Sequence, residues 1–436
     1  MEGDRLGGEC PNYACNPSKT LLRSARIYSY LKRAGEFGLS VGEVSFDWKK
    51  IATRRDHIIE LITQNGKRYE EEFARAGIAL VRGPARFVSE HTVEVDGRGL
   101  TAGRFVVATG SRPQIPDVEG LDRVGYLTSR EAVLASGLPS SVAILGGGAV
   151  GVEFAQLYAA FDVPTTLIDN TDLVTTEDPE IRAYLRGLLE AQGLTVYEWA
   201  EVTGAGREGN RRWLTLTVEG RQERVVADEI LVATGRAPAV DDLELQIPGV
   251  EMSDQGIVTD DTLQTRHPDF WAAGDVVGKM LFTHVASYEG YVAGTNAAGE
   301  TPPLHEDLRV VPRVTFAEPE IASVGLTEPE ARQSGYEVAV RRHDFSTQSR
   351  ALMMGELNGF VKIVLSAASE EILGGHIIGP RAGELIHEIA VAMRNGLRFS
   401  QISETIHAYP TLAEAVGAAE AVKTPPSKKP PRELKG

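Results

Sequence analysis

Two cysteines, Cys10 and Cys15, lie five positions apart and are the only cysteines in the 436-residue chain. A secreted disulfide scaffold would carry many more. A zinc site needs about four ligands, and no His or further Cys clusters near this pair. Two close thiols can exchange with an external disulfide, and Cys15 directly precedes a helix that Pro17-Ser18 is expected to open, where a thiolate is favoured. The pair therefore predicts a redox centre without a metal.

A second chemical feature is the segment Gly146-Gly147-Gly148-Ala149-Val150-Gly151, which fits the pattern G-x-G-x-x-G. It lies between an apolar strand predicted at 141–145 and a helix predicted through Ala160, and that setting identifies a nucleotide-binding loop. The first glycine permits a tight turn, the third lets backbone N–H groups approach a pyrophosphate, and the last allows close helix–strand packing. A glycine-rich turn without a ligand is the alternative.

Asp169 ends the second predicted strand of this βαβ unit, at 164–169. An acid about 20 residues beyond the glycine loop binds the 2′-hydroxyl of a ribose. The same acid would repel the 2′-phosphate of NADP(H), and no Arg or Lys lies between residues 165 and 181. The sequence therefore predicts a preference for NAD(H) over NADP(H).

A chain of 436 residues is too long for one hydrophobic core, so two to four domains are expected to position these features. Helical spacing dominates 26–80, β-type runs occur from 78 to 110, and strands and helices follow again after 304. The Pro- and Lys-rich residues 424–436 are expected to be disordered. A net charge of −16 argues against a nucleic-acid partner. No apolar run could span a bilayer and no secretory signal is present, so the expected location is the cytoplasm.

These motifs resemble those of the pyridine nucleotide–disulfide oxidoreductases, the group that holds lipoamide dehydrogenase, glutathione reductase and mercuric reductase. The resemblance covers nearly the whole chain. It implies an α/β fold with two Rossmann-like three-layer nucleotide-binding domains, for FAD and NAD, and an α+β C-terminal dimerisation domain. It is carried by residues 7–19, the glycine loop, two Ala-Thr-Gly segments at 108–110 and 233–235, Ala273-Gly274-Asp275, and the segment from His407 to Glu414.

The resemblance also implies how the chain divides. The FAD-binding domain would comprise 1–137 and 266–304, an NAD-binding domain would interrupt it at 138–265, and the dimerisation domain would span 305–423. A two-fold homodimer is implied, because each site would borrow Tyr409 and Glu414 from the partner.

Individual roles follow from the same resemblance. Cys10 would be the interchange thiol that meets the substrate, and Cys15 would lie against the flavin. Lys19 would sit beside the flavin and pair with Glu153, although a solvated helix charge is the alternative. Asp275 would bind FAD, unless it is an ordinary N-cap. The other implied FAD contacts are Glu2, Gly83, Thr109, Gly110 and Ser111, and the implied NAD contacts are Gly146, Gly147, Gly148, Ala149, Val150, Gly151, Val152, Glu153, Asp169 and Gly235.

The N-terminus departs from the family pattern. Family members begin with a βαβ unit whose glycine fingerprint binds the FAD pyrophosphate. Here Met1-Glu2 stands where the second strand of that unit ends, with Glu2 in place of the ribose-binding acid. Either the natural start lies upstream, which we favour, or the flavin site is damaged.

The C-terminal segment departs as well. In lipoamide and glutathione reductases a His directly precedes Pro-Thr, whereas this chain has Tyr409 there, with Glu414 at the usual spacing. A phenol with a pKa of about 10 is a poor proton shuttle near pH 7, so fast turnover of lipoamide or glutathione is not expected. His407 is either a compensating base or, as we favour, a structural residue.

A third departure concerns mercuric reductase, which uses an additional C-terminal cysteine pair that this chain lacks. Thr283-His284-Val285-Ala286 and Tyr409 nevertheless resemble mercuric-reductase-like members. The favoured hypothesis is that NADH reduces FAD, FAD reduces Cys10–Cys15, and the dithiol reduces a disulfide or another electrophile. The alternatives are a mercuric-reductase-like enzyme, a quinone-reducing flavin diaphorase and a non-catalytic NAD-binding remnant.

Overall fold

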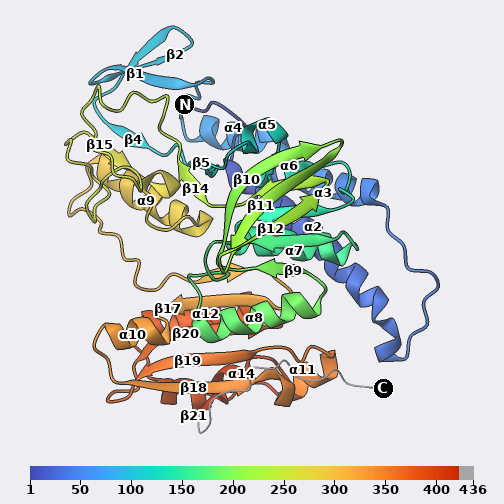
Figure 1. The fold of residues 1–436 in the computed structure, drawn as a ribbon. Helices are drawn as coiled ribbons and strands as arrows, with labels where there is room; N and C mark the ends of the chain where they lie inside the picture. The colour runs from blue at the N-terminus through green and yellow to red at the C-terminus, as the bar shows by residue number, and fades with distance from the viewer. Residues whose placement is uncertain (422–436) are drawn as a thin grey trace.

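The computed structural model describes residues 1–421, and the tail predicted at 424–436 lies outside them. The chain forms an N-terminal part with the cysteines, a middle part around a five-stranded parallel sheet, and a C-terminal part built on a six-stranded antiparallel sheet (Figure 1). The predicted mixed α/β class is confirmed. None of the described helices is long and apolar enough to cross a membrane.

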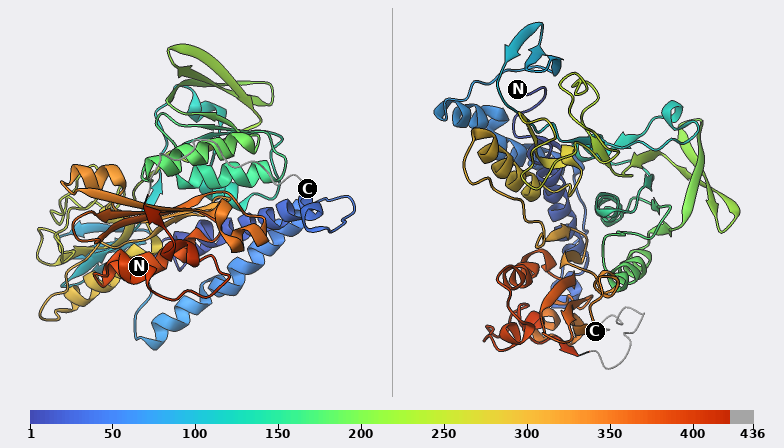
Figure 2. Two further views of the ribbon diagram at one scale, coloured as in Figure 1. Left: turned by 90° about the horizontal axis from the view of Figure 1, so that it is seen from below. Right: turned by 90° about the vertical axis from the view of Figure 1, so that its left-hand side faces the viewer.

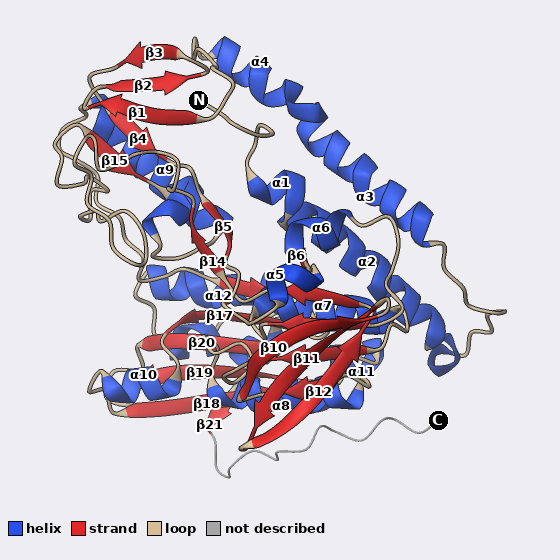
Figure 3. Ribbon diagram, turned by 45° about the horizontal axis from the view of Figure 1, so that its top comes forward, coloured by secondary structure: helices blue, strands red, loops and turns tan. Residues whose placement is uncertain are grey.

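The N-terminal part carries both cysteines on consecutive helices. Cys15 is the first residue of its helix rather than the residue before it. Two later helices run end to end along one side of the molecule (Figure 3). The helices are α1 (Glu9–Tyr13), α2 (Cys15–Lys32), α3 (Trp48–Thr63) and α4 (Lys67–Arg75), with short 3-10 turns at Ala34–Phe37 and Gln64–Gly66.

Short strands complete this part. β1 (Ala85–Ser89), β2 (Thr92–Val95) and β3 (Arg98–Thr101) form an antiparallel sheet. A later segment of the chain returns to the N-terminal part, because β15 (Phe270–Ala272) pairs in parallel with β4 (Phe105–Val107), and β14 (Arg236–Pro238) pairs with β5 (Ser111–Pro113). A 3-10 turn at Gly274–Val277 and helix α9 (Thr283–Ala298) follow.

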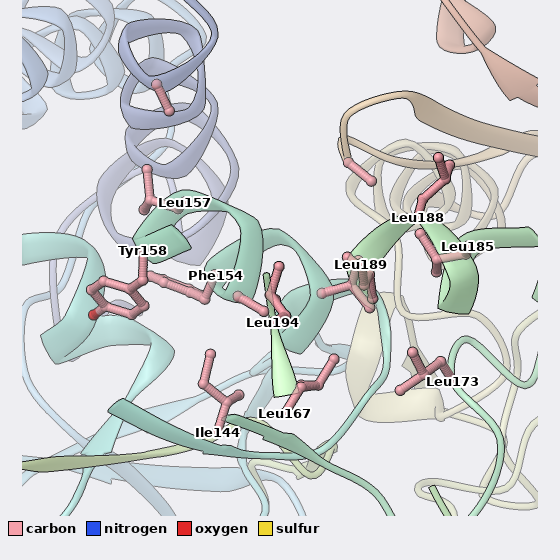
Figure 4. Packing of buried hydrophobic residues seen from close by; sticks show 14 of the residues in the cluster. Ile144, Phe154, Leu157, Tyr158, Leu167, Leu173, Leu185, Leu188, Leu189 and Leu194 are labelled. Atoms are coloured by element: carbon pink, nitrogen blue, oxygen red, sulfur yellow. The ribbon is translucent and has the colours of Figure 1, made fainter. Parts of the chain in front are cut away.

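The middle part is a parallel sheet whose strand order is β6-β13-β7-β8-β9. Because side chains alternate along a strand, Ile144 packs on one face among the helices and Leu145 packs on the other face against a three-stranded sheet. Figure 4 shows the helical side of this core. The elements are β6 (Leu127–Thr128), β7 (Val142–Leu145), β8 (Thr165–Ile168), β9 (Thr195–Tyr197), β13 (Glu229–Val232), the three-stranded sheet of β10 (Ala200–Glu208), β11 (Arg211–Val218) and β12 (Arg221–Ala227), and helices α5 (Leu121–Val124), α6 (Ser129–Leu134), α7 (Ala149–Ala160) and α8 (Pro179–Ala191).

The packing differs from the division predicted at 138–265. β6 joins the parallel sheet before residue 138. At the other end, Leu245, Val250 and Ile257 share a core with Phe87 of the N-terminal part, so the chain has returned there well before residue 265. Two-residue strands and irregular segments of this kind carry no periodicity that a sequence pattern could record.

The C-terminal part is an antiparallel sheet in the order β16-β17-β20-β19-β18-β21, and α12 contacts β17 and β20. The right view of Figure 2 shows this part, in orange and red, at one end of the molecule. The strands and helices expected after residue 304 are present. The elements are β16 (Arg313–Thr315), β17 (Glu320–Gly325), α10 (Glu328–Gln333), β18 (Val338–Asp344), a 3-10 turn at Phe345–Thr347, α11 (Ser349–Met354), β19 (Phe360–Ser366), β20 (Ile372–Gly379), α12 (Ala382–Arg394), α13 (Phe399–Ser403), α14 (Glu414–Gly417) and β21 (Glu420–Ala421).

Candidate functional site

The two cysteines meet at the junction of three helices. Cys10 lies in α1 and Cys15 begins α2, and their half-buried free thiols lie within hydrogen-bonding distance of each other. The Cys15 Sγ is also 3.6 Å from the Oγ1 of Thr283, the first residue of α9. Two helix N-termini therefore point their positive ends toward Cys15, which favours a thiolate there.

The same contacts separate the protonation behaviour of the two thiols. The hydrogen bond from Cys10, the Thr283 hydroxyl and the charge of Lys19 outweigh burial and lower the pKa of Cys15 to about 6. The hydrogen bond to Cys15 and burial raise the pKa of Cys10. Because the two thiols titrate as a pair, the dithiol has one easily formed thiolate on Cys15 and one retained proton on Cys10.

The ion pair expected between Lys19 and Glu153 is present beside the cysteines. Lys19 Nζ lies 2.6 Å from Glu153 Oε2, and the other carboxylate oxygen accepts the Phe316 N–H at 2.9 Å. Lys19 also lies over the Phe316 ring. The Glu153 side chain is 6% exposed and that of Lys19 is 32% exposed, so the carboxylate is buried whereas the lysine side chain remains partly accessible. These contacts join α2, α7 and the C-terminal part at one point.

The glycine loop has the geometry that a pyrophosphate requires. Gly146 has φ 103°, and a Cβ there would clash with the Ala233 carbonyl oxygen at 2.3 Å. A Cβ on Gly151 would lie 1.8 Å from the Gly146 oxygen, so the helix packs directly on the turn. Around Gly148 nothing lies within 4 Å, which leaves its backbone open to a ligand. Ala149 then begins α7 with exposed Val150, whereas Val152 is fully buried.

Asp169 is oriented across the end of this loop. Its carboxylate accepts the N–H of Gly147 on one oxygen and both the N–H and the hydroxyl of Thr171, at 2.8 and 2.7 Å, on the other. The acid is thus held at the carboxyl end of β8, next to the loop that would hold the pyrophosphate.

A second polar cluster contains two of the residues predicted to bind FAD, Ser111 and Asp275. The Ser111 hydroxyl donates to Asp275 at 2.5 Å. Arg236, which the sequence did not single out, donates to the Ser111 hydroxyl and carbonyl at 2.7 and 2.8 Å and lies 3.8 Å from Asp275. It also lies 4.0 Å from Glu9, the neighbour of Cys10. A hydroxyl, a carboxylate and a guanidinium at one point fit the polyhydroxyl and phosphate groups of FAD.

The remaining predicted FAD positions lie near the strand ends. Glu2 and Gly83 are joined by a backbone hydrogen bond of 2.9 Å, and Gly83 has φ 124° with Asp96 too close to admit a Cβ. Thr109 and Gly110 follow β4. Gly235, which was predicted to contact NAD rather than FAD, is exposed with φ 117° after β13.

Residues 2–290 match the family described as pyridine nucleotide-disulphide oxidoreductase, and residues 311–420 match its dimerisation domain. The chain belongs to this family. It is therefore a FAD-dependent oxidoreductase of the disulfide reductase type, as the sequence predicted.

The relatives of this oxidoreductase are named for different reactions. It is 39% identical over 424 residues to the dihydrolipoyl dehydrogenase of Chlorobaculum tepidum, and the match covers 95% of this chain and 89% of that protein. It is 35% identical over 424 residues to the mercuric reductase of Bacillus cereus, and the match covers 96% of this chain but 66% of that protein. The HOCl-induced flavoprotein disulfide reductase RclA from Escherichia coli superimposes with a TM-score of 0.83 at 25% identity, covering 95% of this chain and 91% of that one.

The C-terminal segment of the oxidoreductase lies apart from the cysteines in the single chain. Tyr409 is 72% exposed, and Glu414 accepts the Thr411 N–H at 2.9 Å rather than orienting Tyr409. His407 has both ring nitrogens beside acceptors, the Thr405 carbonyl at 2.9 Å and a Glu388 oxygen at 2.7 Å. Both ring nitrogens of His407 therefore face partners within its own segment and α12 rather than a substrate, which supports its structural interpretation over that of a base.

Glu289 is a further site residue that sequence reasoning missed. This acid of α9 is 1% exposed and accepts the Gly274 N–H at 2.7 Å, which holds the turn that presents Asp275. Burial is the main cause that raises its pKa to about 7. An acid between the buried apolar residues Val285 and Val292 was the available signal.

Proposed function

We propose that this oxidoreductase uses NADH, through FAD, to reduce the Cys10–Cys15 disulfide, and that the resulting dithiol reduces an external disulfide. The observation that carries the proposal is the Cys10–Cys15 pair itself, with Cys15 contacting Thr283 and lying near Lys19. When bound, FAD supplies two-electron transfer between a nicotinamide and sulfur. The groups that fit it are Ser111, Asp275 and Arg236.

The proposed order of attack follows the roles that the family resemblance implies for the two cysteines, and Cys10 gives up its proton as it attacks. The Cys10 sulfur attacks the external disulfide and forms a mixed disulfide, while one thiol of the acceptor leaves with the Cys10 proton. The Cys15 sulfur, as thiolate, then attacks Cys10 and releases the second thiol. One disulfide bond is broken and one is formed, so the acceptor gains two electrons and two protons, the second proton coming from solvent.

The coenzyme proposal is NADH rather than NADPH. Asp169 occupies the position that would meet a 2′-phosphate, and the first arginine after it, Arg182, is paired with Asp172 at 2.8 Å. The nearest cation in the sequence is therefore already neutralised. A kcat/KM for NADH well above that for NADPH is expected, and equal values would contradict this assignment.

A homodimer and a cytoplasmic location belong to the same proposal. Residues 311–420 match a dimerisation domain, and exposed Tyr409 and Ile406, the latter 97% exposed, are available for a second copy. A reducing compartment suits a dithiol that cycles between two redox states.

Replacing Cys10 by Ser tests the proposed function. NADH-dependent reduction of a small aromatic disulfide should be abolished, because the mixed disulfide cannot form. NADH-dependent quinone reduction by the same variant is the internal control that its cofactors are bound. Disulfide reduction that persists in Cys10→Ser would contradict the proposal, and wild-type protein that reduces only quinones would establish the diaphorase alternative.

A further inference from the structure

A single exposed tryptophan stands beside the residues proposed for NAD. Trp199 follows β9 and is 65% exposed, and its φ of 56° lies in the left-handed region. A bulky side chain at positive φ is a genuine outlier, and such strain persists only where surrounding contacts impose it. Residues of this kind cluster at ligand-binding sites, so the contacts that hold Trp199 indicate the site to which it belongs.

Those contacts all come from the loop that carries Asp169. The Trp199 N–H donates to the Thr171 carbonyl at 3.4 Å, and the next residue, Ala200, donates to the Asp169 carbonyl at 2.9 Å. The indole Nε1 donates to Asp172 Oδ1 at 2.9 Å. The tryptophan is therefore fixed to the ribose-binding loop by both its backbone and its ring nitrogen.

The neighbouring acid Glu198 strengthens this attachment. Its side chain is 7% exposed, accepts the Leu173 N–H at 2.8 Å and pairs with Arg186 of α8. Leu173 in turn contacts the glycine loop, because a Cβ on Gly147 would meet its side chain at 2.3 Å. The glycine loop, the ribose acid and Trp199 thus form one connected surface at the carboxyl ends of β7, β8 and β9.

We infer that Trp199 is a stacking platform for the adenine of the dinucleotide, an inference that rests on the proposed use of NADH. The adenine is joined to the ribose that Asp169 would bind, so it must lie within a short distance of that acid. The indole presents a broad exposed aromatic surface there, and its only polar group is already bonded to Asp172. Stacking recognises the flat face of a base without further hydrogen bonds.

Binding of NAD+ and AMP to the full-length protein tests the inference without relying on turnover. Trp199→Ala should weaken both ligands about tenfold in calorimetric titrations, since both contain adenine. Trp199→Phe should retain most of the affinity because it keeps an aromatic face. Trp199→Asn, a residue that tolerates positive φ, should lose as much as Ala, which separates stacking from backbone strain.

Trp213 provides the matched control. It is a tryptophan of the same middle part, packed against Gly206 and Arg224, and Trp213→Ala should leave the NAD+ affinity of folded protein unchanged. Unchanged NAD+ affinity in both Trp199→Ala and Trp199→Asn would overturn the inference. Wild-type protein that binds no NAD+ would instead overturn the proposed function, so the two failures are distinguishable.

Discussion

Two lysine–carboxylate sites connect the middle part of the oxidoreductase to the neighbouring parts. We call the partly exposed one, at Lys19, the open site, and the enclosed one, at Lys362, the closed site. Lys19, 32% exposed, meets one carboxylate, Glu153, next to the cysteines. Lys362 of β19 is 2% exposed and lies 2.6–3.0 Å from oxygens of three carboxylates. Two of these, Asp178 and Glu180, begin α8, and the third, Glu328, begins α10.

The difference in exposure indicates that the open site can take part in the reaction, whereas the closed site stabilises the fold. A fully enclosed cation among fixed carboxylates cannot meet a ligand. The partly exposed Lys19, paired with the buried Glu153, can place its charge beside a ligand. Burial would raise the pKa of Asp178, but its neighbours His376 and Lys362 outweigh burial and lower that pKa, which favours the ionised carboxylate beside Lys362.

Removing Lys362 should give the largest loss of stability. Lys362→Met leaves Asp178, which is 0% exposed, without its cation, and removal of one partner from a buried pair costs about 3–5 kcal/mol. Urea unfolding of the purified variant measures this loss. The control is Lys32→Met, which breaks an exposed pair with Asp162 and should cost under about 1 kcal/mol. Equal losses in the two variants would show that enclosure does not matter.

Removing Lys19 should affect the rate of flavin reduction more than the stability of the fold. Lys19→Met should cost less stability than Lys362→Met, because Lys19 is partly solvated and the buried Glu153 keeps its hydrogen bond from the Phe316 N–H. The rate of flavin reduction by NADH should fall on the order of a hundredfold, since a fixed charge beside the reacting groups is lost. Stopped-flow absorbance at saturating NADH measures that rate. A variant with normal flavin reduction and lowered stability would reverse the comparison and make Lys19 a structural residue.

The sequence predicted the open site much better than the closed one. Cys10, Cys15, Lys19 and the glycine loop form compact motifs, and the resemblance supplied the long-range Lys19–Glu153 pair. The left-handed turn at Gly146 follows from local sterics, which a motif records directly.

The closed site and the polar cluster at Ser111 depend on tertiary packing. Lys362 lies in a run that reads as a buried strand, and nothing local reveals that α8 and α10 bring carboxylates to it. Arg236 reaches Ser111 only because β14 pairs with β5. Periodicity and capping describe single elements, whereas these partners are set by the way elements meet. The positive φ of Trp199 is likewise imposed by contacts with Thr171 and Asp172, which no propensity would predict.

The smallest expected effect tests whether the charge of Lys19 reaches the redox pair. Alkylation of reduced protein by iodoacetamide should increase as pH rises through about 6, because the thiolate of Cys15 forms there, with peptide mass analysis locating the label. Lys19→Met should move this midpoint upward by less than about one pH unit, since Lys19 contributes less than the hydrogen bonds from Cys10 and Thr283. Lys362→Met should leave the midpoint where it is. A midpoint near 9 in the wild type would contradict thiolate stabilisation, and a shift in Lys362→Met equal to that in Lys19→Met would show that the two sites are not electrostatically separate.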